Sequence, residues 1–103
     1  MIWVDFAKSF LSSVASLDKD HLTSIIADDF SFHFNGFFVA SKDSFLANIL
    51  PTKIIIRSFA YANKNIFFEC FLEGYGENCC IIEIDSNGKV KCFKIYGGAN
   101  VDH

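Results

Sequence analysis

The spacing of apolar residues changes along this chain, and the change restricts the fold more than any other feature. In three segments before Pro51, apolar side chains recur every three or four positions, which is the spacing of one helix face. From Lys53 onward they recur with a period of two, which is typical of strands. This order predicts an α+β domain in which helices cover one face of an antiparallel sheet.

Three helices are predicted in the first half of the chain. The first covers residues 3–17, where the apolar residues form one broad, partly aromatic stripe. The second starts after Asp18, a residue type that caps helix N-termini, and ends before the acidic pair at 28–29. The third starts after Ser41 and stops at Pro51, a length of about ten residues.

Residues 30–40 read as a β-hairpin, because Asn35-Gly36 lies between two apolar runs and favours a type I′ turn. This turn would place Phe34 opposite Phe37, His33 opposite Phe38 and Phe32 opposite Val39. A meander of four strands is then expected, each bounded by residue types that favour turns. These strands are 54–62, 66–73, 79–85 and 90–96.

The composition fits one folded domain over residues 1–103. The chain has a mass of 11.6 kDa and contains 13 Phe but only one Pro, so its aromatic side chains must be largely buried. The formal net charge is -3, without the clustered Lys and Arg that nucleic acids or anionic membranes require. An uninterrupted apolar run of transmembrane length is also missing. We therefore expect neither nucleic acid nor a membrane as a partner.

The four cysteines are expected to behave as small apolar residues with free thiols. Cys70, Cys79, Cys80 and Cys92 contain no Cys-x-x-Cys pair, and the adjacent Cys79 and Cys80 would point to opposite faces of a strand. A disulfide framework, a metal site or a bound cofactor is therefore not expected. A protein with such cysteines suits the reducing cytoplasm.

Two local motifs, taken with the order of elements, resemble a known family. Ala27-Asp28-Asp29-Phe30-Ser31-Phe32 follows a short helix, and Asn87-Gly88-Lys89-Val90 separates the last two strands. The chain resembles the nuclear transport factor 2-like superfamily, on its SnoaL-like and ketosteroid isomerase-like side. The resemblance implies a cone-shaped, strongly curved antiparallel sheet, with three N-terminal helices on its concave face and a pocket inside. It also implies a homodimer through the outer face of the sheet.

The resemblance argues against isomerase chemistry of the best-known kind. The three polar catalytic positions of ketosteroid isomerases fall on Phe10, Phe34 and Cys80 in this chain. Proton transfer between carbon atoms needs a positioned base and an oxyanion donor, and phenylalanine supplies neither.

The same alignment implies a largely apolar pocket wall for a small hydrophobic ligand. Glu69 is its one carboxylate, and burial among Phe and Ile would favour the protonated form that a general acid needs. A one-residue slip in strand register would instead place Glu69 outside, paired with Lys or Arg. The expected ligand-binding residues are Phe10, Val14, Phe34, Glu69, Phe71, Ile82, Phe93 and Ile95, with Ile84 on the same wall.

Other polar candidates carry weaker signals. His33 is more often a packed or surface residue than a base in such a position. Tyr61 and Tyr96 lie late in their strands, where a hydroxyl could reach a cavity mouth. Arg57 could hold an anionic ligand or pair across strands with Glu73, and the pairing is favoured.

Three functions remain open from the sequence. The first is a small-molecule-binding domain, and the second an isomerase, cyclase or dehydratase that uses Glu69 as its acid/base. The third is a protein-interaction domain that needs no polar group inside the cone. The expected homodimer would cover apolar side chains on the outer face. These were identified as Ile66, Phe68, Cys70, Leu72, Ile81 and Tyr96.

Overall fold

Residues 2–97, the part of the chain that the computed structural model describes, form three helices and six strands. This confirms the predicted α+β class. None of the helices in this part is both long and apolar enough to cross a membrane. The elements are α1 (Ile2–Ser16), α2 (Lys19–Ile25), β1 (Ile26–Phe34), β2 (Phe37–Ser41), α3 (Lys42–Asn48), β3 (Ile54–Ala62), β4 (Asn65–Leu72), β5 (Gly76–Ile84) and β6 (Val90–Gly97).

The second and third helices are shorter than predicted. The Asp18 carboxylate accepts a hydrogen bond from the His21 backbone N–H, which confirms the predicted cap of α2. However, the chain becomes extended at Ile26, so the acidic pair at 28–29 belongs to strand β1. Helix α3 has seven residues, and Ile49 after it is already extended. The proline at 51 disfavours helical geometry in the residue before it, which helps to end the helix early.

The predicted hairpin is present, but it contains a bulge. Asn35 and Gly36 have positive φ angles of 52° and 87°, as a type I′ turn requires. Phe34 pairs with Phe37 and His33 with Phe38, as predicted. Phe32, however, pairs with Ala40 and not with Val39, because the register shifts between Phe32 and His33. A bulge of this kind inserts one extra residue into one strand, which the turn sequence alone does not reveal.

The six strands form one mixed sheet in the order β2-β1-β6-β5-β4-β3. Four of the neighbouring pairs are antiparallel, and β1 pairs with β6 in parallel. The expectation of an entirely antiparallel sheet was therefore wrong. The hairpin and the meander are each antiparallel because short turns connect their strands. The direction of the hairpin relative to the meander is set by the pairing of β1 with β6, two strands that are far apart in the sequence.

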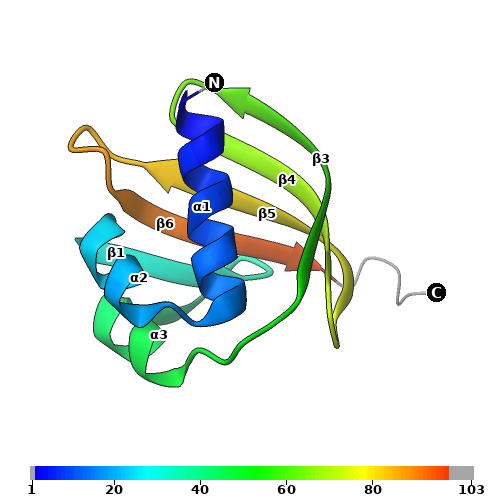
Figure 1. Cartoon of the computed structure of the whole chain (residues 1–103), viewed down its shortest axis with the longest axis horizontal. Helices are drawn as coiled ribbons and strands as arrows, with labels where there is room; N and C mark the ends of the chain where they lie inside the picture. Colours follow the sequence, from blue (N-terminus) through cyan, green and yellow to red (C-terminus); the bar gives the residue numbers. More distant parts are fainter. Residues whose placement is uncertain (1, 98–103) are drawn as a thin grey trace.

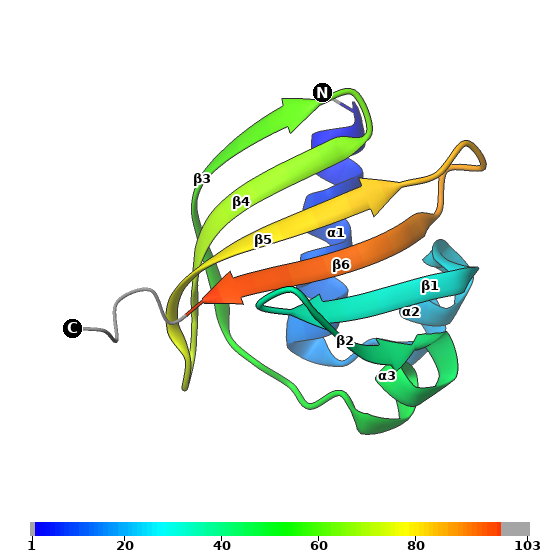
Figure 2. The same cartoon turned by 180° about the vertical axis from the view of Figure 1, so that it is seen from behind.

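All three helices lie on the same side of the sheet, as the two opposite views show (Figures 1 and 2). Helix α1 crosses several strands, and β3 and β4 bend around it (Figure 1). Helices α2 and α3 are grouped near β1 and β2. We call the side that carries the helices the inner face and the opposite side the outer face.

Five phenylalanine rings fill the space between the helices and the inner face. Phe10 of α1 makes an edge contact with Phe93 of β6, with ring centroids 5.1 Å apart. Phe32 lies between Phe93 and Phe45, at 5.4 and 5.3 Å, and Phe30 also contacts Phe45 at 5.0 Å. We call Phe10, Phe30, Phe32, Phe45 and Phe93 the Phe cluster. It joins α1, α3, β1 and β6 into one core.

Candidate functional site

Strand β4 shows which side chains face inward. Burial alternates along it, with one apolar set completely or almost completely buried. Glu69 lies in the other set, is exposed and faces outward together with Phe71. The prediction that Glu69 and Phe71 line the interior was therefore wrong. The buried set is Ile66, Phe68, Cys70 and Leu72.

The physical reason is the difference in burial energy between the two sets. One set is wholly apolar, whereas the other contains Glu69, whose ionised carboxylate loses hydration energy when it is buried without a partner. Since side chains alternate with a period of two, a register one residue away exchanges the faces of the whole strand. The alternation itself was the signal in the sequence that could have placed Glu69 outside.

Most other residues predicted for the pocket wall do lie together on the inner side. Phe10, Val14, Ile82 and Phe93 are buried, and Ile84 belongs to the same core. Ile95 is half-buried, and Phe34 beside it remains 37% exposed at the end of β1. Their binding of a ligand stays a prediction.

The inner side is packed with side chains where the pocket was expected. Phe10 and Phe93 are in direct edge contact, and both are almost inaccessible to solvent. The third position of the isomerase pattern, Cys80, is also buried. Cys80 is surrounded by the apolar core, and the side chains at these three positions offer neither a base nor an oxyanion donor.

The outer face carries apolar and charged side chains side by side. Phe67, Phe71 and Ile81 are half-buried there, while Ile55 and Tyr96 are more exposed. Phe67 pairs with Ile81, and Phe71 with Ile55, across neighbouring strands. Of the residues predicted for this face, Ile81 and Tyr96 are on it, whereas the four alternating residues of β4 are in the core. That part of the interface prediction was wrong for the same register reason.

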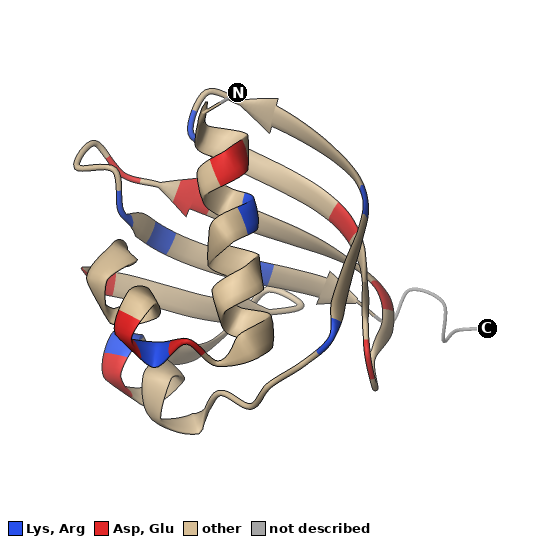
Figure 3. Ribbon diagram, in the orientation of Figure 1, with Lys and Arg blue, Asp and Glu red and all other residues tan. Residues whose placement is uncertain are grey.

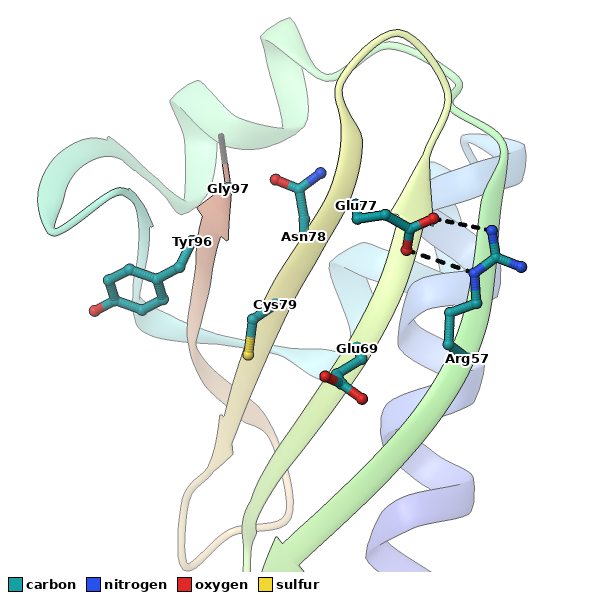
Figure 4. A pocket seen from close by; sticks show the side chains of 7 residues that line it. All are labelled: Arg57, Glu69, Glu77, Asn78, Cys79, Tyr96 and Gly97. Atoms are coloured by element: carbon teal, nitrogen blue, oxygen red, sulfur yellow. Dashed lines mark hydrogen bonds and ion pairs between the residues drawn. The ribbon is translucent and has the colours of Figure 1, made fainter. Parts of the chain in front are cut away.

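An open cleft of about 450 Å³ lies on the outer face, across β3 to β6 (Figure 4). Glu69 and Cys79 are opposite each other in the β4–β5 ladder, and Cys79 pairs in turn with Tyr96 of β6. The cleft thus spans four adjacent strands. It is lined by Arg57, Glu69, Glu77, Asn78, Cys79, Tyr96 and Gly97.

Both carboxylates of the cleft already have partners. The Arg57 guanidinium donates to Glu77, with Nη2 2.9 Å from Oε2 and Nε 3.5 Å from Oε1 (Figure 4). This hydrogen bond and the negative charge of Glu77 raise the pKa of Arg57. Ser58 donates a hydrogen bond to the Glu69 carboxylate. Arg57 was predicted to pair with Glu73, so Glu77 is the residue that the sequence analysis missed.

Further polar contacts border the apolar part of the outer face. Lys94 Nζ lies 3.0 Å from Glu83 Oε2, and the hydrogen bond to Glu83 raises the pKa of Lys94. His33 Nε2 is 2.9 Å from Ser31 Oγ, and the His33 ring contacts Phe38 edge-on. His33 thus fits the reading as a packed surface residue.

The charges as a whole are mixed in sign. Acidic and basic residues are interspersed over helices and strands and are not sorted into separate regions (Figure 3). Within residues 2–97, no three His, Cys, Asp or Glu side chains come together in a way that could hold a metal ion. On the outer face, Arg57, Lys94 and Ser58 each contact a carboxylate.

The cysteines and the remaining tyrosine occupy distinct places. Cys80 is buried in the core and Cys79 is half-exposed on the outer face, as predicted for adjacent strand residues. Cys92 is buried and accepts a hydrogen bond from Ser31. Tyr61 is exposed and lines a smaller cleft of about 180 Å³ beside the start of α1, away from the Phe cluster.

The architecture is shared with several solved structures of low sequence identity. An NTF2-like protein of unknown function from Cytophaga hutchinsonii has a TM-score of 0.79 at 8% identity, over 95% of this chain and 91% of that one. An LEH-like epoxide hydrolase of M. tuberculosis has 0.77 at 13%, over 95% and 84%. A SnoaL-like protein of unknown function from Burkholderia thailandensis has 0.76 at 10%, over 94% of both chains.

At the level of sequence, no family model matches this chain, and no curated protein matches it significantly. The structural likeness therefore carries the assignment, and it extends over nearly the whole chain. The order of helices and strands is also the one that the spacing of apolar residues predicted. The chain has the nuclear transport factor 2-like fold, with SnoaL-like proteins among its structural neighbours.

Proposed function

We propose that this protein is an association domain whose partner is a second copy of the chain, bound through the outer face of the sheet. The observation that carries the proposal is the contrast between the two faces. The inner side is filled by the Phe cluster, whereas the outer face leaves Ile55, Phe71 and Tyr96 in contact with water. A homodimer would cover these side chains.

The arrangement of the outer face suits such an interface. Protein interfaces combine apolar and polar side chains. Here Phe67 is opposite Ile81 and Phe71 is opposite Glu77 in the β4–β5 ladder, with Glu69 between the two phenylalanines, and two ion pairs lie on the same face. Arg57 and Lys94 already form ion pairs with carboxylates of their own chain. The cost of desolvating unpaired charges would therefore be lower when two copies meet. The exposed apolar area of the outer face is what supports the proposed homodimer.

Light scattering combined with size exclusion tests this proposal. At micromolar concentration the wild-type protein should elute with twice the chain mass of 11.6 kDa. Tyr96→Asp and Ile81→Glu should each weaken the dimer at least about tenfold, which corresponds to about 1.4 kcal/mol. Leu50→Glu is the matched control, since Leu50 is apolar and 74% exposed but belongs to the segment after α3.

Two outcomes would contradict the proposal. One is a wild-type protein that stays monomeric up to high micromolar concentration. The other is a dimer that Leu50→Glu weakens as much as the outer-face variants do. Far-UV circular dichroism of each variant separates lost association from lost folding.

A small apolar ligand bound on the inner side is a second candidate. Among the predicted wall residues on the inner side, Phe34 is exposed and Ile95 beside it is half-buried, so an entrance would lie at the ends of β1 and β6. One neighbour of the same fold is named an epoxide hydrolase, so the fold accommodates enzymes. Ligand binding on the inner side would require a strongly curved, cone-shaped sheet and a rearrangement of the Phe cluster. An enzymatic role for Glu69 inside the cone is not supported, because Glu69 lies on the outer face.

Binding of an apolar probe distinguishes the two candidates. Toluene, titrated into the isotopically labelled protein, should shift the NMR signals of Phe34, Ile95 and Phe93 if the inner side accepts a ligand. Shifts confined to Phe71, Ile81 and Tyr96 would place the apolar binding surface on the outer face instead. The free thiols suit a reducing compartment, and we propose the cytoplasm as the compartment of this protein.

A further inference from the structure

Two buried thiols face each other across strands β4 and β5. The Sγ atoms of Cys70 and Cys80 are 3.2 Å apart, and both residues are inaccessible to solvent. In the ladder Phe68 is opposite Cys80, and Cys70 is opposite Asn78. The two cysteines are therefore diagonal neighbours that point to the inner face of the same strand pair.

The two sulfur atoms are in direct contact. A disulfide bond has an S–S length of about 2.05 Å, so roughly 1 Å of further approach separates this contact from a covalent bond. The antiparallel strands already hold the two backbones side by side, and the connecting turn is short. The strand pairing thus holds the two thiols next to each other.

We propose that Cys70 and Cys80 are a peroxide-sensitive modification site at which oxidation forms an intramolecular disulfide between β4 and β5. Cys79 cannot take part, because its side chain lies on the outer face. Cys92 lies on β6, where it contacts Ser31. The pair is therefore selected by geometry from among the four cysteines.

The two sulfur atoms have different roles in the reaction. The Cys70 thiolate attacks hydrogen peroxide, so that an S–O bond forms and the O–O bond breaks, and the released hydroxide takes up the thiol proton as water. Cys80 sulfur then attacks Cys70 sulfur, the S–S bond forms, and the leaving hydroxide departs as water with the Cys80 proton. Two thiols and one peroxide thus give one disulfide and two waters.

The environment supports this order. The hydrogen bond from Cys80 lowers the pKa of Cys70, while the same contact and burial raise the pKa of Cys80. Cys70 is therefore the first of the two thiols to ionise, and the thiolate is the form that attacks peroxide. Since both groups are buried, the rate is limited by local opening of the β4–β5 pair, and a small uncharged oxidant is the class that reaches it.

Mass spectrometry of the reduced wild-type protein treated with hydrogen peroxide is the test. The intact mass should fall by about 2 Da, as expected for loss of two hydrogen atoms on disulfide formation. Alkylation after unfolding should label two thiols where the reduced protein has four. Peptide mapping should recover Cys70 linked to Cys80, and dithiothreitol should reverse the change.

Variants separate the two roles. Cys80→Ala should stop the reaction at a Cys70 sulfenic acid, which dimedone traps, and Cys70→Ala should abolish the mass loss. Cys79→Ala and Cys92→Ala are matched controls that should oxidise as the wild type does. If the wild-type peptide map shows free thiols at Cys70 and Cys80 after Cys79 itself has been oxidised, or a link between other cysteines, the proposal is wrong. Because the peptide map is made from the wild-type protein, its result does not depend on whether the variants fold.

Discussion

At the scale of single residues, the alternation of buried and exposed side chains along β4 determines which candidate residues face the core. Phe68 and Glu69 are neighbours in sequence, yet one is completely buried in the core and the other faces water. The difference comes from the two-residue period of a strand, which assigns alternate side chains to opposite faces. A carboxylate that looked like an interior acid is therefore an outer-face residue bound by Ser58.

Alanine substitutions at two phenylalanines of β4 test this assignment. Phe68→Ala should lower the free energy of unfolding by about 3–5 kcal/mol, because it removes a fully buried ring and leaves a cavity. Phe71→Ala should cost only about 1 kcal/mol, since Phe71 keeps contact with solvent. Urea denaturation measures both values. Equal losses, or a larger loss for Phe71→Ala, would contradict the observed faces.

The thiol of Cys92 predicts a dependence of stability on alkaline pH. Burial raises the pKa of Cys92 in the folded protein, whereas an unfolded thiol ionises near pH 8.5. Above about pH 8 the unfolded chain therefore loses this proton first, and the free energy of unfolding falls as pH rises.

Urea denaturation between about pH 7 and 10, in the presence of reductant, measures this effect. Cys92→Ala should show a shallower fall with pH than the wild type. Leu50→Ala is the control and should keep the wild-type slope, because it removes no titrating group. An identical slope in Cys92→Ala and wild type would show that this thiol does not contribute.

At the scale of elements, the β1–β2 hairpin connects local sequence to the sheet. Asn35 and Gly36 adopt the left-handed conformation, and the Asn35 side chain accepts a hydrogen bond from the Gly97 backbone N–H at 2.9 Å. The Asn35 N–H in turn donates to the Ile95 carbonyl at 2.8 Å. The turn is thus tied to the end of β6 as well as closing its own hairpin.

Gly36→Ala should therefore destabilise the protein by about 1 kcal/mol or more, because a Cβ atom is strained at a φ of 87°. Phe37→Ala at the next position is the control, since Phe37 is 76% exposed and its loss should change stability by less than about 0.5 kcal/mol. Thermal denaturation of both variants provides the comparison. A neutral Gly36→Ala would contradict the assigned turn conformation.

At the scale of the whole molecule, one apolar core holds the two antiparallel units together. Phe93 of the meander contacts Phe10 of α1 and Phe32 of the hairpin, so the core spans the parallel β1–β6 contact. We expect the stability of the fold to come from this packing.

A chelator or fresh reductant should consequently leave the melting temperature of the reduced protein unchanged. Differential scanning calorimetry with EDTA, with dithiothreitol and with neither compound makes the comparison. A melting temperature several degrees lower with EDTA would show that a metal ion contributes to the fold. The peroxide-treated protein serves as the positive control for a thiol effect, because its proposed disulfide responds to dithiothreitol.

Local sequence determined the kinds of element and the bounds of some of them. The predicted strand 54–62 coincides with β3, and Asp18 caps α2 as expected. The Asn35-Gly36 turn was also correct, since turn geometry depends on the residues that form it. In each case the interactions that decide the outcome join residues a few positions apart.

Tertiary structure decided what covers β4, the parallel β1–β6 pairing and the packing of the interior. The period of two and the wholly apolar set of β4 indicate which face is buried, but the elements that bury it, α1 and the partner strands, are distant in sequence. Likewise, the Arg57–Glu77 contact joins positions on β3 and β5, and the Cys70–Cys80 contact depends on the β4–β5 register. These features arise from contacts between distant segments, whose free energies no local pattern encodes.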